Sequence, residues 1–114
     1  MAYPYGTYND EVVQILKKCK IQYARSVVSS GAFKLQKNLL IFKPTCHHAD
    51  ENIWELLEKF LKEKSEEKQL FYIWGHSYEF DVNNNWKRME EILDRLIGHN
   101  NIFYGTNREV LLPC

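Results

Sequence analysis

A short apolar run that ends in a glycine–histidine pair constrains the fold of this chain more than any other feature. The segment Phe71–Phe80 reads FYIWGHSYEF, and the five consecutive apolar residues 70–74 directly precede its glycine–histidine pair. Apolar runs of this length bounded by glycine are typical of buried strands. In α/β proteins the ligand crevice lies at the carboxyl ends of the strands, so His76 is a candidate acid or base. The alternative is a hydrogen-bonded loop histidine without a chemical role.

Length and composition limit the class of protein. The 114 residues suffice for one domain at most, which we expect to span residues 1–114. Lys+Arg and Asp+Glu both number 15, and this balance argues against binding to nucleic acid or an anionic membrane. No apolar run approaches the roughly 18 residues of a membrane span, so we expect a soluble, cytoplasmic protein. Cys19, Cys46 and Cys114 lack CxxC spacing, which favours reduced thiols.

Three segments have the apolar spacing of amphipathic helices. The first is a helix of about ten residues that follows the cap and acidic residues Asn9–Glu11. The second follows Asp50 as its cap, and the third ends at Gly98. The apolar positions in these three helices are Val12, Ile15, Leu16 and Cys19; Ile53, Trp54, Leu57, Phe60 and Leu61; and Trp86, Met89, Leu93, Leu96 and Ile97.

Four other short segments have the composition of strands. They are Ile21–Ala24, Leu39–Phe42, Ile102–Tyr104 and Val110–Leu112. Strand patterns that alternate with helix patterns are typical of βα units around a parallel sheet. The sequence therefore predicts an α/β fold with a largely parallel sheet and three main helices.

Two groups of polar residues surround the candidate histidine. His47 and His48 could bind a metal, but adjacent side chains on an extended segment point to opposite faces, and no carboxylate stands at an H-x-x-H or HExxH spacing. We therefore expect a polar loop or groove contact there, and no metal site. Glu79 and Asp81 could each orient the imidazole of His76, or could be solvated charges that cap the next helix.

Aromatic residues alternate with polar ones in the same segment. Trp74 and Tyr78 flank the glycine–histidine pair, where their rings could serve as platforms for sugar rings. For Trp74 the alternative is burial in the core, the commoner fate of a tryptophan in an apolar strand. His99, directly after Gly98, is expected to interact with the helix dipole.

Several motifs together resemble a known family. They are YPYGTYN at 3–9, KPTCHH at 43–48 and WGHSYEF at 74–80, followed by Trp86 and YGTN at 104–107. Over nearly the whole chain they look like the C-terminal half of the polysaccharide deacetylase family, of the carbohydrate esterase type. The resemblance implies a partial (β/α) barrel. It also implies metal-dependent hydrolysis of N-acetyl or related amide C–N bonds on carbohydrates.

The resemblance also implies roles for single residues. His76 matches the general acid, and Tyr5 matches the position whose backbone stabilises the oxyanion. Together with the polar and aromatic residues described above, this gives the predicted substrate contacts: Tyr3, Tyr5, Gly6, His47, His48, Trp74 and Glu79.

Other parts of the family pattern have no counterpart in this sequence. The family holds its divalent metal, zinc or a similar ion, with an aspartate and two histidines, and it uses an aspartate base. These motifs precede the Pro-Tyr-Gly turn, which here stands at 4–6. We therefore expect no cofactor in this chain, a metal only in a full-length relative, and no activity of the chain alone.

Two functions follow from these observations. The first is that of a deacetylase-like hydrolase represented by its C-terminal portion. The alternative is a non-catalytic module, derived from that fold, for carbohydrate binding or assembly. Either function implies a carbohydrate ligand, with neither nucleic acid nor membrane as partner. Unpaired sheet edges would favour a homo-oligomer.

Overall fold

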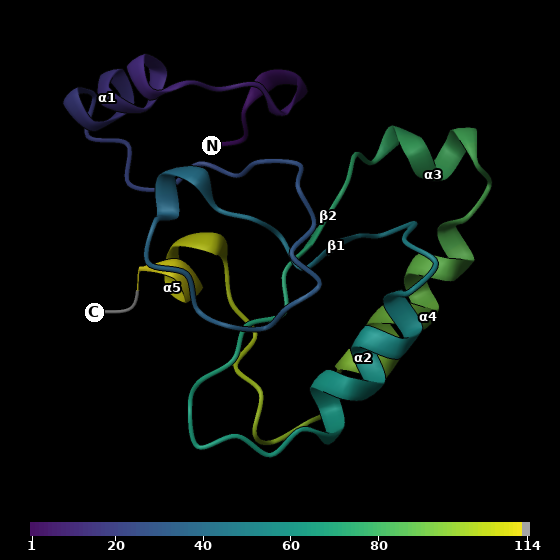
Figure 1. The fold of residues 1–114 in the computed structure, drawn as a ribbon. Helices are drawn as coiled ribbons and strands as arrows, with labels where there is room; N and C mark the ends of the chain where they lie inside the picture. The colour runs from purple at the N-terminus through teal and green to yellow at the C-terminus, as the bar shows by residue number, and fades with distance from the viewer. Residues whose placement is uncertain (113–114) are drawn as a thin grey trace. The chain divides into compact units, whose positions relative to one another are not determined.

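The computed structural model describes residues 1–112, which form a small mixed α/β structure (Figure 1). Residues 113–114, and with them the predicted free thiol of Cys114, lie outside the described part. Two 3₁₀ helices span Pro4–Gly6 and Leu39–Ile41. The helices and strands are α1 (Asp10–Lys18), β1 (Cys46–His47), α2 (Ile53–Lys62), β2 (Ile73–Trp74), α3 (Tyr78–Val82), α4 (Trp86–Leu96) and α5 (Asn107–Leu111).

The predicted partial barrel is wrong. Within residues 1–112 the only sheet consists of β1 and β2, which run parallel. The predicted strands Ile21–Ala24 and Leu39–Phe42 are replaced by isolated parallel bridges, from Arg25 to Ala2 and from Arg25 to Phe42. A bridge of one residue pair cannot extend into the ladder that a barrel requires.

Local hydrogen bonds explain two of the missing strands. The side chain of Asn38 accepts the N–H of Leu40 at 3.3 Å, at the start of the second 3₁₀ helix. The predicted strand Val110–Leu112 lies instead at the C-terminal end of α5. This helix starts after a capping box between Thr106 and Glu109, with N–H to oxygen distances of 2.7 and 3.3 Å. Such bonds favour helical turns over extended chain. Ile102–Tyr104 belongs to no regular element.

The three predicted helices are confirmed as α1, α2 and α4. The side chain of Asn9 caps α1 by accepting the N–H of Val12 at 2.8 Å. Asn52, and not Asp50, occupies the cap position of α2. After α4, Gly98 adopts a φ of 78°, a conformation that favours glycine at a helix end.

The chain divides into two compact units. The first comprises residues 1–46 and 65–72. Its core contains Tyr3, Ala24 and Leu40, against which apolar residues of α1 pack. Cys46 is buried and Cys19 is exposed.

The second unit comprises residues 47–64 and the chain from 73 onward. In it α2 and α4 lie side by side (Figure 1). Ile53 and Leu57 of α2 and Ile92 of α4 are fully buried, and Glu58 forms an ion pair with Arg95. This helix pair supports the candidate site. None of the helices in residues 1–112 has the length and apolar character needed to cross a membrane.

Candidate functional site: a histidine–glutamate cluster

Three histidines and a glutamate meet where β1 and β2 end, within the second unit. His47 is the last residue of β1, and His48 follows it. His76 lies between β2 and α3, and Glu79 lies in the first turn of α3. Because the strands are parallel, their carboxyl ends meet at one edge, and the backbone N–H of His48 donates to the carbonyl of Trp74 at 3.0 Å.

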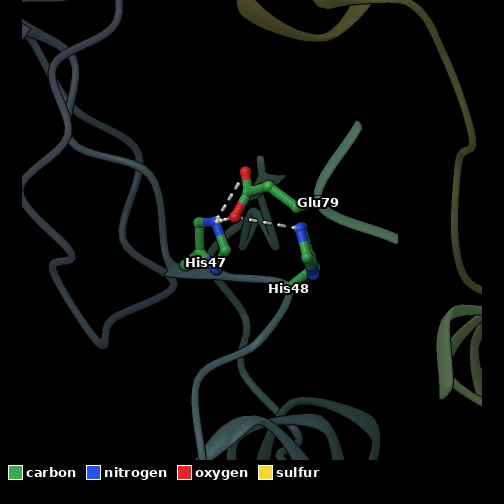
Figure 2. A group of neighbouring side chains, drawn as sticks. All are labelled: His47, His48 and Glu79. Atoms are coloured by element: carbon green, nitrogen blue, oxygen red, sulfur yellow. Dashed lines mark hydrogen bonds and ion pairs between the residues drawn. The ribbon is translucent and has the colours of Figure 1, made fainter. Parts of the chain in front are cut away.

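The carboxylate of Glu79 is the centre of the cluster (Figure 2). Its Oε2 lies 2.9 Å from Nε2 of His47 and 3.7 Å from Nε2 of His48. Its Oε1 accepts the backbone N–H of His76 at 2.7 Å and lies 2.9 Å from Nδ1 of the same residue. A single carboxylate therefore faces three imidazoles.

Burial differs sharply among the three histidines. The side chain of His48 is 3% exposed, that of His47 23% and that of His76 56%. Nε2 of His48 is buried and has no hydrogen-bond partner among the described residues. His76 alone can meet a large molecule from solution without rearrangement.

Two neighbours fix the buried imidazole of His48. The ring of Phe80 lies 4.4 Å from it, between centroids. On the other side, a Cβ on Gly75 would come within 2.6 Å of Nε2. Only glycine allows the backbone after β2 to approach the ring this closely.

Arg88 of α4 holds the backbone that carries His48. Its guanidinium donates to the carbonyl of Asp50 at 2.8 Å and to that of His48 at 3.3 Å. The guanidinium carbon also lies 5.7 Å from the ring centre of Trp54, within range of a cation–π contact. The role of Arg88 could not be predicted from the sequence, because its hydrogen-bond partners are backbone carbonyls 38 and 40 positions away.

The surroundings set the charges of the buried groups. Burial alone would raise the pKa of Glu79, but hydrogen bonds from His76 and His47 outweigh it and lower the pKa to about 2. Burial and the proximity of His47 and Arg88 lower the pKa of His48 by more than the carboxylate of Glu79 raises it. At neutral pH Glu79 is therefore a carboxylate and His48 a neutral imidazole.

Glu79, and not Asp81, contacts the imidazole of His76. Asp81 instead accepts the indole N–H of Trp86 at 2.7 Å. The expectation that His47 and His48 point apart is wrong, since their ring centroids lie 4.2 Å apart. β1 ends at His47, so the alternation of side chains along a strand does not continue to His48.

The two aromatic residues flanking the glycine–histidine pair differ in exposure. Trp74 is partly buried and packs edge-on against His47 at 4.7 Å. Tyr78 is 63% exposed, and its ring centroid lies 5.4 Å from that of His76. Tyr78 is therefore the better placed of the two to meet a ligand.

The predicted residues of the Tyr-Pro-Tyr-Gly turn belong to the first unit. Tyr3 is buried, and its hydroxyl donates to the carbonyl of Leu40 at 2.5 Å. Tyr5 is almost fully exposed, and Gly6 lies so close to Val27 that a Cβ would overlap it. The oxyanion role of Tyr5 stays a prediction. Among the predicted site residues, the second unit gathers His47, His48, Trp74 and Glu79 around His76.

A scan against models of protein families and searches among curated proteins and solved structures found no match. The resemblance to the polysaccharide deacetylase family stays a prediction.

Proposed function

We propose that this chain supplies the proton-transferring group of a hydrolase that cleaves N-acetyl or related amide bonds on carbohydrates. The observation that carries the proposal is the 2.9 Å contact between Nδ1 of His76 and Oε1 of Glu79. Because Glu79 is ionised, it accepts a hydrogen bond and keeps a proton on Nδ1. Nε2 of His76 is then the nitrogen that exchanges a proton with a substrate.

Amide hydrolysis needs such a group. The C–N bond breaks only when the departing nitrogen receives a proton, and a positioned imidazolium supplies it through Nε2. Glu79 stabilises the positive charge on the ring and fixes its orientation, as carboxylates do for catalytic histidines elsewhere. The acyl carbon takes the hydroxyl of water. Water activation belongs, by the resemblance, to family motifs that have no counterpart in this sequence.

The carbohydrate part of the proposal rests on the aromatic neighbours of His76. Binding sites for organic ligands combine aromatic side chains with a few well-placed polar groups. The exposed ring of Tyr78 and the indole of Trp74, 6.0 Å from the imidazole of His76, provide this combination. A sugar ring stacked on Tyr78 would place its substituents beside the proton-transferring nitrogen.

The test uses the full protein encoded by the natural gene. Acetate release from an N-acetylated oligosaccharide is measured for the wild type, His76→Ala and His99→Ala. We expect His76→Ala to lower kcat by about 10²–10⁴-fold with little change in KM. His99→Ala is the matched control, because this histidine contacts the carbonyl of Arg95, at 3.0 Å, and not the cluster. Normal turnover by a folded His76→Ala variant would overturn the proposal.

The exposure of Tyr78 also favours the second candidate, a non-catalytic carbohydrate-binding module. In that case Tyr78→Ala abolishes oligosaccharide binding, measured by calorimetry, while the wild-type protein releases no acetate. Turnover by the wild-type protein excludes this alternative.

A further inference from the structure

We propose that His47, His48 and Glu79 bind a divalent transition-metal ion, for which zinc is the best match. Two imidazoles and one carboxylate are a donor set that catalytic zinc sites use, with a fourth position left for water or substrate. This site is new relative to the sequence analysis, which assigned no metal ligand to the chain.

The distances between the three ligand atoms are close to those of a tetrahedral metal site. Each residue offers one ligand atom, and the three atoms lie within 4.8 Å of one another. In a tetrahedral zinc site with bonds of about 2.0–2.1 Å, the ligand atoms lie about 3.3 Å apart. The separations from Oε2 of Glu79 to Nε2 of His47 and of His48, 2.9 and 3.7 Å, lie on either side of this value. A contraction of at most about 1.5 Å therefore completes the site.

A second, independent observation comes from the buried imidazole of His48. Its Nε2 has no hydrogen-bond partner in the described part of the chain, although buried polar groups are normally paired. The nitrogen faces Oε2 of Glu79 across 3.7 Å, which is too long for a hydrogen bond (Figure 2). An ion between the two atoms would satisfy both.

The protonation of His47 must change when the ion binds. In the metal-free chain, Nδ1 of His47 accepts the backbone N–H of Ala49 at 3.0 Å. Its Nε2 therefore carries the proton and donates it towards Glu79. Coordination through Nε2 by a neutral imidazole requires this proton to move to Nδ1 by exchange with solvent, and the Ala49 hydrogen bond then breaks. The amide signal of Ala49 reports this step directly.

The residues around the cluster hold the ligands in place. Arg88 fixes the backbone of His48, and Phe80 and Gly75 confine its ring. Glu79 can coordinate through Oε2 and keep Oε1 on His76. Partners of this kind orient metal ligands and strengthen binding. Because two of the three donors are nitrogen, the site should prefer zinc and cobalt(II) to magnesium.

The experiment needs no substrate, so its outcome is independent of the hydrolase proposal. The chain is freed of metal with a chelator and titrated with Zn²⁺ by calorimetry, with Co²⁺ by visible absorption, and with Mg²⁺ as a control. We expect one Zn²⁺ per chain, the strong visible bands of four-coordinate cobalt(II), and no Mg²⁺ binding. Zn²⁺ should also shift the Ala49 amide resonance.

Variants locate the ion. We expect His47→Ala, His48→Ala and Glu79→Gln each to weaken Zn²⁺ binding by at least about 100-fold. His99→Ala and Cys19→Ser, which remove potential zinc-binding groups outside the cluster, should bind as the wild type does. His48 is buried and its variant can unfold, so the partly exposed His47 and the near-isosteric Glu79→Gln provide the decisive measurements. The proposal is overturned if the folded wild-type chain binds no Zn²⁺, or if these two variants retain wild-type affinity.

Discussion

Gly75→Ala should abolish zinc binding by a purely steric route. A Cβ at position 75 would lie 2.6 Å from Nε2 and 3.3 Å from Cγ of His48. Cδ2 of the same ring would lie closer still, and unstrained contacts between heavy atoms need about 3.5 Å, so the imidazole must retreat by more than about 1 Å. The backbone also resists the change, because Gly75 has a φ of 158°, which side chains rarely permit.

The expected magnitudes follow from this displacement. Metal ligands tolerate errors of about 0.2 Å, so a ring displaced by about 1 Å no longer coordinates. Zn²⁺ affinity should fall by at least about 100-fold, equivalent to about 2.8 kcal/mol. Overpacking of a buried site costs a further 1–3 kcal/mol or so in the free energy of unfolding.

Gly98→Ala is the matched control. Gly98 also has a positive φ, 78°, but a Cβ there would meet nothing within 4 Å. This variant should lose about 1–2 kcal/mol of stability through backbone strain and keep its Zn²⁺ affinity. Urea unfolding and Zn²⁺ calorimetry on both variants separate the two effects. Wild-type Zn²⁺ affinity in a folded Gly75→Ala protein would refute the steric argument.

Two further predictions concern the surroundings of the cluster. Arg88→Ala should lower the free energy of unfolding by about 2–3 kcal/mol and weaken Zn²⁺ binding about tenfold, because two backbone carbonyls lose their charged donor. The control is Lys87→Ala at the neighbouring position. Equal effects in the two variants would contradict a role of Arg88 in holding the backbone of His48. In the metal-free chain, folding lowers the pKa of Glu79 from 4.5 to about 2. The ionised carboxylate therefore stabilises the folded state, and this stabilisation is fully present above pH 4.5 and is lost as the pH falls towards 2. Urea unfolding between pH 6 and pH 2 should therefore show that Glu79→Gln loses less stability than the wild type as the pH falls. Parallel plots of the free energy of unfolding against pH for the two proteins would exclude this contribution of Glu79.

The sequence by itself determined the helices and one part of the site. Apolar spacing and the side chain of Asn9 define α1, and Gly98 follows the end of α4, because these signals act between residues a few positions apart. Glu79 and His76 are likewise three positions apart, so their contact could be expected from the sequence. These features depend on neighbouring residues, which the sequence shows directly.

The tertiary structure decided the strands and the rest of the cluster. Short apolar runs such as Leu39–Phe42 form strands only if a partner strand pairs along their length. Here the local hydrogen bond from Leu40 to Asn38 favours a 3₁₀ helix, and only a single bridge forms at Phe42. His47 meets Glu79 across 32 positions, and Arg88 meets the carbonyl of His48 across 40. Such contacts depend on the pairing of β1 with β2 and on the packing of α4. No local pattern encodes them, because the free energy that forms them comes from groups brought together only when the chain folds.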